Sequence, residues 1–188
     1  MIGGTVDEQR GALRHLRVLP IVIMIAISAF AQSDQWAALR VFEGSWEGTT
    51  SGKPGVGSTS REYRFELGGK FLSQRDKSVY RQSPEAKPFV HEDFGFLSYD
   101  ADLKKVVWRQ FHSEGFVNEY TLNSVSADGA SLVFVTAHIE NLPGFRAKKL
   151  YRIVSSDEID ETFWLAPPGK DFDVYTVAHL RRITSASK

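Results

Sequence analysis

The segment Arg109–Tyr120 (RQFHSEGFVNEY) concentrates side chains that could do chemistry. It carries the imidazole of His112 and the carboxamides of Gln110 and Asn118 among large apolar groups. A histidine titrates near neutral pH and can serve as a general base or a metal ligand. The two amides could recognise the polar end of a small molecule. Residues 113–115 favour a turn, so the segment is predicted to be a β-hairpin.

Which of these side chains share a face depends on strand register, because residues opposite each other across a hairpin point to the same side of the sheet. Turns near Asp102, Gly115 and Gly129 set the expected registers. The predicted facing pairs are Glu92 with His112, Phe96 with Trp108, Trp108 with Tyr120, Gln110 with Asn118, Arg109 with Glu119, Tyr120 with Thr136, and Asn118 with His138.

The face that holds Trp108 is the more apolar and is the expected interior. Its polar members gather toward one end, where they could line a cavity. The predicted ligand-binding residues are Glu92, Phe94, Phe96, Trp108, Gln110, His112, Asn118, Tyr120, Phe134 and His138. The alternative is a network of polar groups that satisfy one another, since an unpaired buried donor or acceptor costs about 1 to 3 kcal/mol. No catalytic residue is predicted in the main interpretation.

These side chains must be positioned by strands, because the chain after Gly44 alternates between strand and turn patterns. Ten strands are predicted, at residues 45–51, 60–67, 70–80, 89–99, 105–112, 116–125, 131–139, 145–154, 158–166 and 173–183. A short helix precedes them, with Trp36 and Leu39 on its buried side. Short turns favour an up-and-down order, and a sheet this long hides its edges by closing. The expected fold is all-β, a closed antiparallel barrel of about ten strands.

Residues 1–31 are predicted to be a secretory signal peptide. Three arginines precede the apolar run from Val18 to Ala31, which ends in the small-x-small pattern Ala29-Phe30-Ala31. The alternative is a membrane anchor, but about 14 apolar residues fall short of the roughly 20 that a helix needs to cross a bilayer. We therefore expect cleavage before Gln32 and export to the periplasm or the medium, without stable membrane insertion.

The remaining residues, 32–188, suit a single domain. Removing residues 1–31 leaves 20 basic and 21 acidic residues of the 23 of each kind in the whole chain, a net charge of −1. This balance argues against a nucleic-acid partner. The chain has no cysteine, so disulfides cannot stabilise it.

The segment Phe42–Gly48 (FEGSWEG) resembles the calycin group, which includes lipocalins and fatty-acid-binding proteins. The resemblance rests on a short helix running into Gly44-x-Trp46 and on Arg181 or Arg182 in the last strand. It implies that the tryptophan closes the barrel floor and that an arginine packs across its ring, a cation–π contact.

Within that group the chain is most similar to nitrobindin-type haem-binding barrels. The resemblance lies in Gly44–Gly48, in the segment His91–Leu97, and in His179 on the last strand. It implies that His179 could be the axial ligand of haem b. The acidic spacing after His91 matches the family pattern only if Asp93 replaces the usual glutamate.

Three further assignments compete. His112, Glu92 and His138 could bind zinc, although they form no compact spaced motif. Glu92 and His112 could act as an acid-base pair in a small barrel enzyme. An inward Arg61 or Arg75 would favour an acidic, lipid-like ligand. The main interpretation is an exported barrel that binds a small hydrophobic or amphipathic molecule without turnover, under a lid at residues 51–57; the sequence does not predict its oligomeric state.

Overall fold

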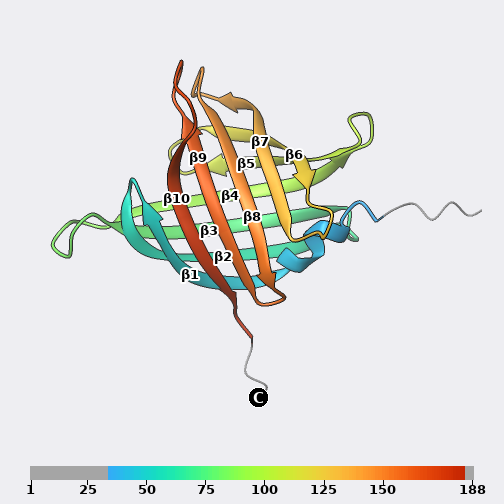
Figure 1. Ribbon diagram of the computed structural model, residues 1–188, viewed down its shortest axis with the longest axis horizontal. Helices are drawn as coiled ribbons and strands as arrows, with labels where there is room; N and C mark the ends of the chain where they lie inside the picture. The colour runs from blue at the N-terminus through green and yellow to red at the C-terminus, as the bar shows by residue number, and fades with distance from the viewer. Residues whose placement is uncertain (1–33, 185–188) are drawn as a thin grey trace, which may run out of the picture. The chain divides into compact units, whose positions relative to one another are not determined.

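Ten antiparallel strands form a closed barrel in this computed structural model (Figure 1), which describes residues 34–184. The predicted signal peptide lies outside the described residues. The strands are β1 (Gly44–Gly52), β2 (Gly55–Glu66), β3 (Phe71–Arg81), β4 (Phe89–Asp100), β5 (Lys105–His112), β6 (Val117–Val125), β7 (Ser131–Glu140), β8 (Arg146–Ser155), β9 (Glu158–Ala166) and β10 (Asp173–Arg182). Each pairs with its neighbours in sequence, and β1 pairs with β10 to close the barrel. The predicted fold class is confirmed.

The hairpin between β1 and β2 is tighter than the sequence predicted. Gly52 pairs with Gly55, so Lys53 and Pro54 alone make the turn. Both glycines have positive φ values, +155° and +122°, and a Cβ at either would meet the backbone of a neighbouring strand. Residues 51–57 therefore belong mainly to the two strands and do not form a loop long enough to act as a lid.

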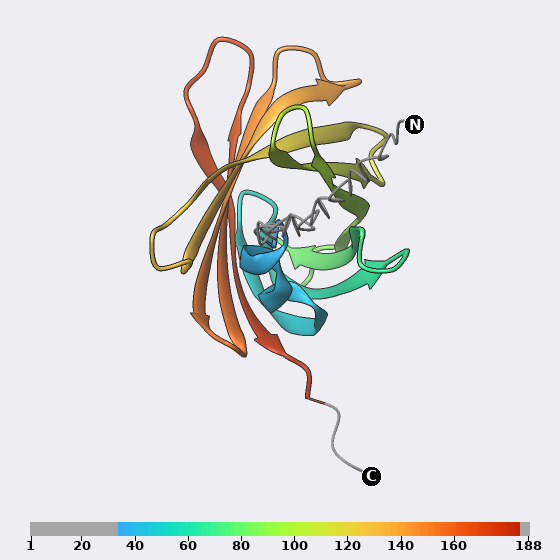
Figure 2. The same ribbon diagram turned by 90° about the vertical axis from the view of Figure 1, so that its right-hand side faces the viewer.

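The short helix is a 3₁₀ helix, η1 (Ala37–Phe42), which covers one end of the barrel (Figure 2). Its Leu39 and Phe42 are buried in the core. The Trp46 indole donates a hydrogen bond to the Phe42 carbonyl at 2.7 Å, and the Arg182 guanidinium lies 4.2 Å from the centre of the Trp46 ring. The expected tryptophan–arginine contact is confirmed, with Arg182 as the arginine. No helix within residues 34–184 has the length and apolarity needed to span a bilayer.

The predicted register between β4 and β5 is wrong by one residue. Asp93 faces His112 and Leu97 faces Trp108, whereas Glu92 and Phe96 were expected there. The turn between these strands holds four residues, 101–104. Within it, Asp100 Oδ1 accepts hydrogen bonds from the backbone amides of Asp102 and Leu103. Because side chains alternate along a strand, this single-residue shift turns every residue of β4 to the opposite face.

The registers of the next two hairpins agree better with the sequence. The pairs Trp108–Tyr120, Gln110–Asn118 and Arg109–Glu119 are confirmed, as is Tyr120–Thr136. Opposite Glu119 and Tyr120, a β-bulge leaves Ala137 of β7 unpaired, so Asn118 faces Ile139 and not His138. A bulge adds one unpaired residue, which turn positions alone do not reveal.

Candidate functional site

The half of the barrel interior next to η1 is filled by side chains. Trp108 is 1% exposed, and its ring packs 5.5 Å from Tyr120 and 5.4 Å from Phe134. Only about 10 Å³ of free space remains between these layers of aromatic and aliphatic groups. This half closes the barrel and leaves no room for a ligand.

The other half contains a cavity of about 260 Å³, close to the lower limit of about 300 Å³ for small-molecule sites. Apolar side chains surround its mouth at the strand ends far from η1: Phe89, Phe116, Ile139, Leu142, Phe163 and Leu165. Charged and polar groups form its floor and one wall: Arg61, Asp76, His91, Asp93, His112, Asn118, Lys149 and Glu161. The cavity is therefore amphipathic along its length.

Arg61, from β2, binds two buried carboxylates at the cavity floor. Its Nε lies 2.9 Å from Asp76 Oδ2 on β3, and its two terminal nitrogens donate to both oxygens of Glu161 on β9. Burial raises the pKa of Asp76 to about 6, because one contact with Arg61 does not offset its desolvation. Burial also opposes ionisation of Glu161, but Arg61 and Lys149 lower its pKa to about 2. The charge of Arg61 is thus already neutralised.

Lys149, from β8, is buried with only 6% of its surface exposed. Its ammonium lies 4.6 Å from the centre of the Trp108 ring and 5.7 Å from those of Tyr120 and Phe163. Within residues 34–184 it makes no ion pair or hydrogen bond, although its field lowers the pKa of Asp93 and of Glu161. An ammonium group has three N–H donors. Lys149 therefore presents unused donors at the cavity floor.

His91, Asp93 and His112 form a cluster on the cavity wall. Burial opposes protonation of His91, but hydrogen bonds to Asp93 and Glu114 raise its pKa to about 9. Burial lowers the pKa of His112 to about 4, so this imidazole is neutral at pH 7. The hydrogen bond from His91 and the charge of Lys149 hold the pKa of Asp93 well below its usual value, against the effect of burial.

The predicted site residues divide between the interior and the surface. His112 and Asn118 line the cavity, whereas Trp108, Gln110, Tyr120 and Phe134 face inward but are buried outside its lining. Glu92, Phe94 and Phe96 lie on the outer face of β4, because of the register shift, and His138 is exposed on β7. The predicted zinc set and the Glu92–His112 acid-base pair are therefore not assembled.

His179 does not point into the barrel, as an axial ligand of a haem bound there would have to. Its side chain is 69% exposed, and Nδ1 lies 2.6 Å from Asp160 on the outer face of β9. The buried side chains of β10 are Thr176, Ala178 and Leu180, none of which is an axial haem ligand. The residues present do not fit a haem bound inside the barrel through His179.

Of the two arginines proposed to hold an acidic, lipid-like ligand, one lies inside the barrel and one outside. Arg61 is buried, as that interpretation required. Arg75 lies on the outer face of β3, 4.4 Å from the centre of the Phe94 ring. Sequence reasoning missed Lys149, Asp76 and Glu161 as members of the site. Strand alternation would have placed them inside only with the correct register for each hairpin.

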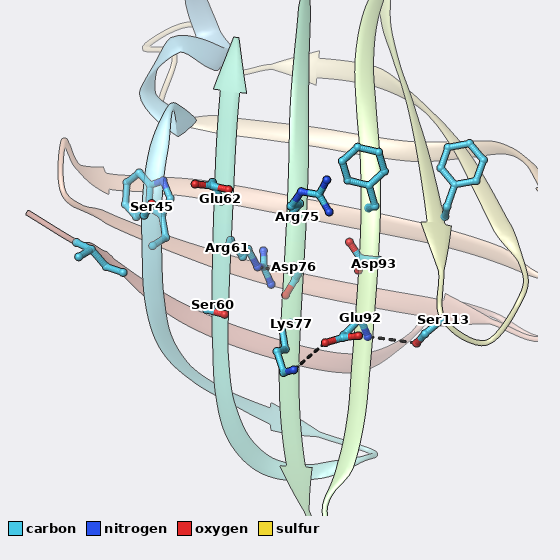
Figure 3. Close-up of a pocket in the computed structure, with 14 residues that line it drawn as sticks. Ser45, Ser60, Arg61, Glu62, Arg75, Asp76, Lys77, Glu92, Asp93 and Ser113 are labelled. Carbon is cyan, nitrogen blue, oxygen red and sulfur yellow. Dashed lines mark hydrogen bonds and ion pairs between the residues drawn. The ribbon is translucent and has the colours of Figure 1, made fainter. Parts of the chain in front are cut away.

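A larger hollow, of about 610 Å³, lies on the outer face of β1–β5 (Figure 3). Lys77 and Glu92 point toward each other across its base and form an ion pair at 2.7 Å. Each is about half exposed, so this pair contributes little to stability. Because its charged groups are solvated and partly paired with one another, the hollow offers weaker recognition than the buried cavity.

Comparisons with known proteins support the fold. No protein-family model and no curated protein matches the chain. Among solved structures, the chain is similar to that of Rv2717c from M. tuberculosis, with a TM-score of 0.62 and 20% identity over 81% of this chain and 99% of the other. It is also similar to the S-type phycobiliprotein lyase CPES from Guillardia theta, with a TM-score of 0.50 and 13% identity over 78% and 90% of the two chains. At these identities the likeness shows a shared β-barrel fold.

Proposed function

We propose that the barrel binds one small amphipathic molecule in its 260 Å³ cavity, without turnover. The observation that carries this proposal is Lys149, a largely buried cation that lines the cavity. A hydrogen bond to a charged group contributes about 1.5 to 3 kcal/mol. A ligand that brings an acceptor to the Lys149 ammonium gains this contribution, so the proposed head group is an acceptor such as a carboxylate or an amide.

The apolar mouth suits the rest of such a molecule. Phe163 and Leu165 continue from the Lys149 level toward the opening, where Phe89 and Leu142 lie at the strand ends. The volume corresponds to that of roughly nine liquid water molecules, so the ligand is small or projects from the mouth. A short alkyl chain with a polar end meets both requirements.

We also propose that the protein is a calycin-type barrel and that it is exported. The contact between Trp46 and Arg182 at the closed end supports a calycin-type barrel, as the sequence resemblance implied. The charged and apolar pattern of residues 1–31 supports export. Export predicts that N-terminal sequencing of the protein from its own host starts at Gln32, and a sequence starting at residue 1 or 2 contradicts it.

Calorimetric titration with octanoate and with its uncharged analogue octanamide tests the binding proposal. At least one of them should bind with one molecule per chain, and their ratio of affinities identifies the charge of the head group. Lys149→Met should weaken binding of the preferred probe at least tenfold. Lys148→Met is the matched control, because this neighbouring lysine lies on the outer face against Trp164. Absence of saturable binding by both probes, or equal losses in the two variants, would overturn the proposal.

A further inference from the structure

We propose that His91, Asp93 and His112 bind one divalent transition-metal ion whose remaining coordination positions face the cavity. This site is separate from the Lys149 contact, and metal binding can be tested without any organic ligand. All three side chains line the cavity, and their candidate ligand atoms lie within 4.8 Å of one another.

The backbone brings the three residues together by strand geometry alone. His91 and Asp93 are two residues apart on β4, so their side chains point to the same face. Asp93 and His112 are direct partners across β4 and β5. Directly opposed residues have Cβ atoms about 4.5 to 5.5 Å apart, within reach of a shared ion.

The distances between ligand atoms are close to those of a metal site. His91 Nε2 lies 3.3 Å from Asp93 Oδ2, and His112 Nδ1 lies 3.9 Å from the same oxygen. Ligands held at about 2.0 to 2.2 Å from a zinc ion are roughly 3 to 3.5 Å apart. The His91–Asp93 pair already has this spacing, and a bound ion would draw His112 Nδ1 closer to Asp93 Oδ2.

In His91 and Asp93, the atom that would not bind the metal already has a hydrogen-bond partner. His91 Nδ1 lies 2.8 Å from Glu114 Oε1, which leaves Nε2 directed at Asp93. Asp93 Oδ1 accepts hydrogen bonds from the amides of Gln74 and Gln110, at 2.8 and 2.7 Å, which leaves Oδ2 facing His91 and His112. Such outer partners orient ligands and are a regular part of metal sites.

His112 supplies the observation that a simple ion pair does not explain. Its side chain is 6% exposed, and Nδ1 has no hydrogen-bond partner within the described residues. Nε2 lies 3.0 Å from the Asn118 amide. With that amide turned so that its oxygen accepts from Nε2–H, the lone pair of Nδ1 points at the cluster.

The competing account is a protonated His91 bridging Asp93 and Glu114 as a structural ion pair. It satisfies those three groups but leaves the buried Nδ1 of His112 without a partner. A metal ion takes the place of the His91 proton and also uses His112. The metal account therefore explains one more buried polar atom than the ion-pair account.

The ligand set limits which ion fits. Two imidazoles and one carboxylate suit Zn²⁺, Fe²⁺ or Co²⁺, whereas Ca²⁺ and Mg²⁺ prefer oxygen ligands. Three protein ligands leave at least one position for water or for a bound molecule. That position opens on the cavity.

Titration of the purified full chain, freed of metal by EDTA and dialysis, tests the proposal with Co²⁺ and Zn²⁺ as probes. We expect one Co²⁺ per chain, with visible ligand-field absorption, and displacement by Zn²⁺. His91→Gln, Asp93→Asn and His112→Gln should each weaken binding at least tenfold. Glu114→Gln should weaken it about tenfold or more through the orientation of His91.

A control variant replaces the three other histidines, His15, His138 and His179, by glutamine and should bind like the wild type. Nitrogen-15 NMR of histidine in the wild-type protein keeps the test valid if the cluster variants fail to fold. Zn²⁺ should then shift the imidazole signals of His91 and His112. Absence of stoichiometric binding, loss of binding in the control variant, or shifts confined to the other histidines would overturn the proposal.

Discussion

The Arg182 guanidinium lies 4.2 Å from the centre of the Trp46 ring and closes the barrel at the end opposite the cavity. The same group donates to the carbonyl of Val41 at 2.7 Å and to that of Ser156 at 2.9 Å. It therefore links η1 and the turn between β8 and β9 to the ends of β1 and β10. Because the side chain of Arg182 is only 23% exposed, these contacts are partly shielded from water.

Arg182→Met should lower the free energy of unfolding by about 2 to 3 kcal/mol, the sum expected for one cation–π contact and the lost charged hydrogen bonds. Urea denaturation measures the change. Arg181→Met is the control, because Arg181 is 80% exposed and, within residues 34–184, pairs only with Glu158. It should change stability by less than about 0.5 kcal/mol. Equal effects of the two substitutions would contradict the role of Arg182.

Glu161→Gln should destabilise the barrel by about 3 kcal/mol at pH 7, because it breaks a buried ion pair and leaves Arg61 with Asp76 alone. The pKa of Glu161 is lowered from 4.5 to about 2 on folding. Its contribution is therefore complete above pH 4.5 and is lost as the pH falls toward 2. The difference between wild type and variant should shrink over that range.

Urea denaturation at pH 7 and at pH 3 checks the pH dependence. Glu158→Gln is the control, since Glu158 is 40% exposed and pairs with Arg181 on the outer face. It should alter stability little at either pH. A wild-type advantage over Glu161→Gln that stays constant between pH 7 and pH 3 would refute the role assigned to this carboxylate.

Gly95→Ala should destabilise the barrel by roughly 1 to 3 kcal/mol, as expected for overpacking. A Cβ at Gly95 would lie 2.5 Å from Trp108 Nε1 and 2.9 Å from the Arg109 carbonyl oxygen. Thermal unfolding followed by circular dichroism measures the loss. A Cβ at Gly68 would meet no atom of the described residues within 4 Å, so the smaller cost of Gly68→Ala reflects its φ of +71°. A Gly95→Ala variant more stable than Gly68→Ala would show that Trp108 is less tightly packed.

The strands were predictable because turn residues separate them clearly, and because a closed barrel is the regular way to hide sheet edges. The contact between Trp46 and Arg182 was likewise expected from the sequence resemblance. The strand positions depend on local patterns, and the Trp46–Arg182 contact depends on residues in the first and last strands. A shift of one residue within a turn does not affect either feature.

The site was harder to predict because it depends on register. The register between β4 and β5 differs by one residue from the expected one, so Asp93 takes the place of Glu92 opposite His112 and His91 faces the interior. A bulge in β7, at Ala137, removes His138 from the interior. Adjacent Lys148 and Lys149 have the same charge and similar neighbours, so only the pairing of β8 with β9 shows which one is buried.

Methyl NMR of the wild-type protein during titration with octanoate tests the central claim, ligand binding inside the cavity, most directly. The claim predicts saturable shifts of the methyl signals of Ile139, Leu142 and Leu165, which line the cavity. The signals of Ile183, which borders the outer hollow, and of exposed Val56 should stay unchanged. Shifts confined to Ile183, or no saturable shift at any of these residues, would contradict it.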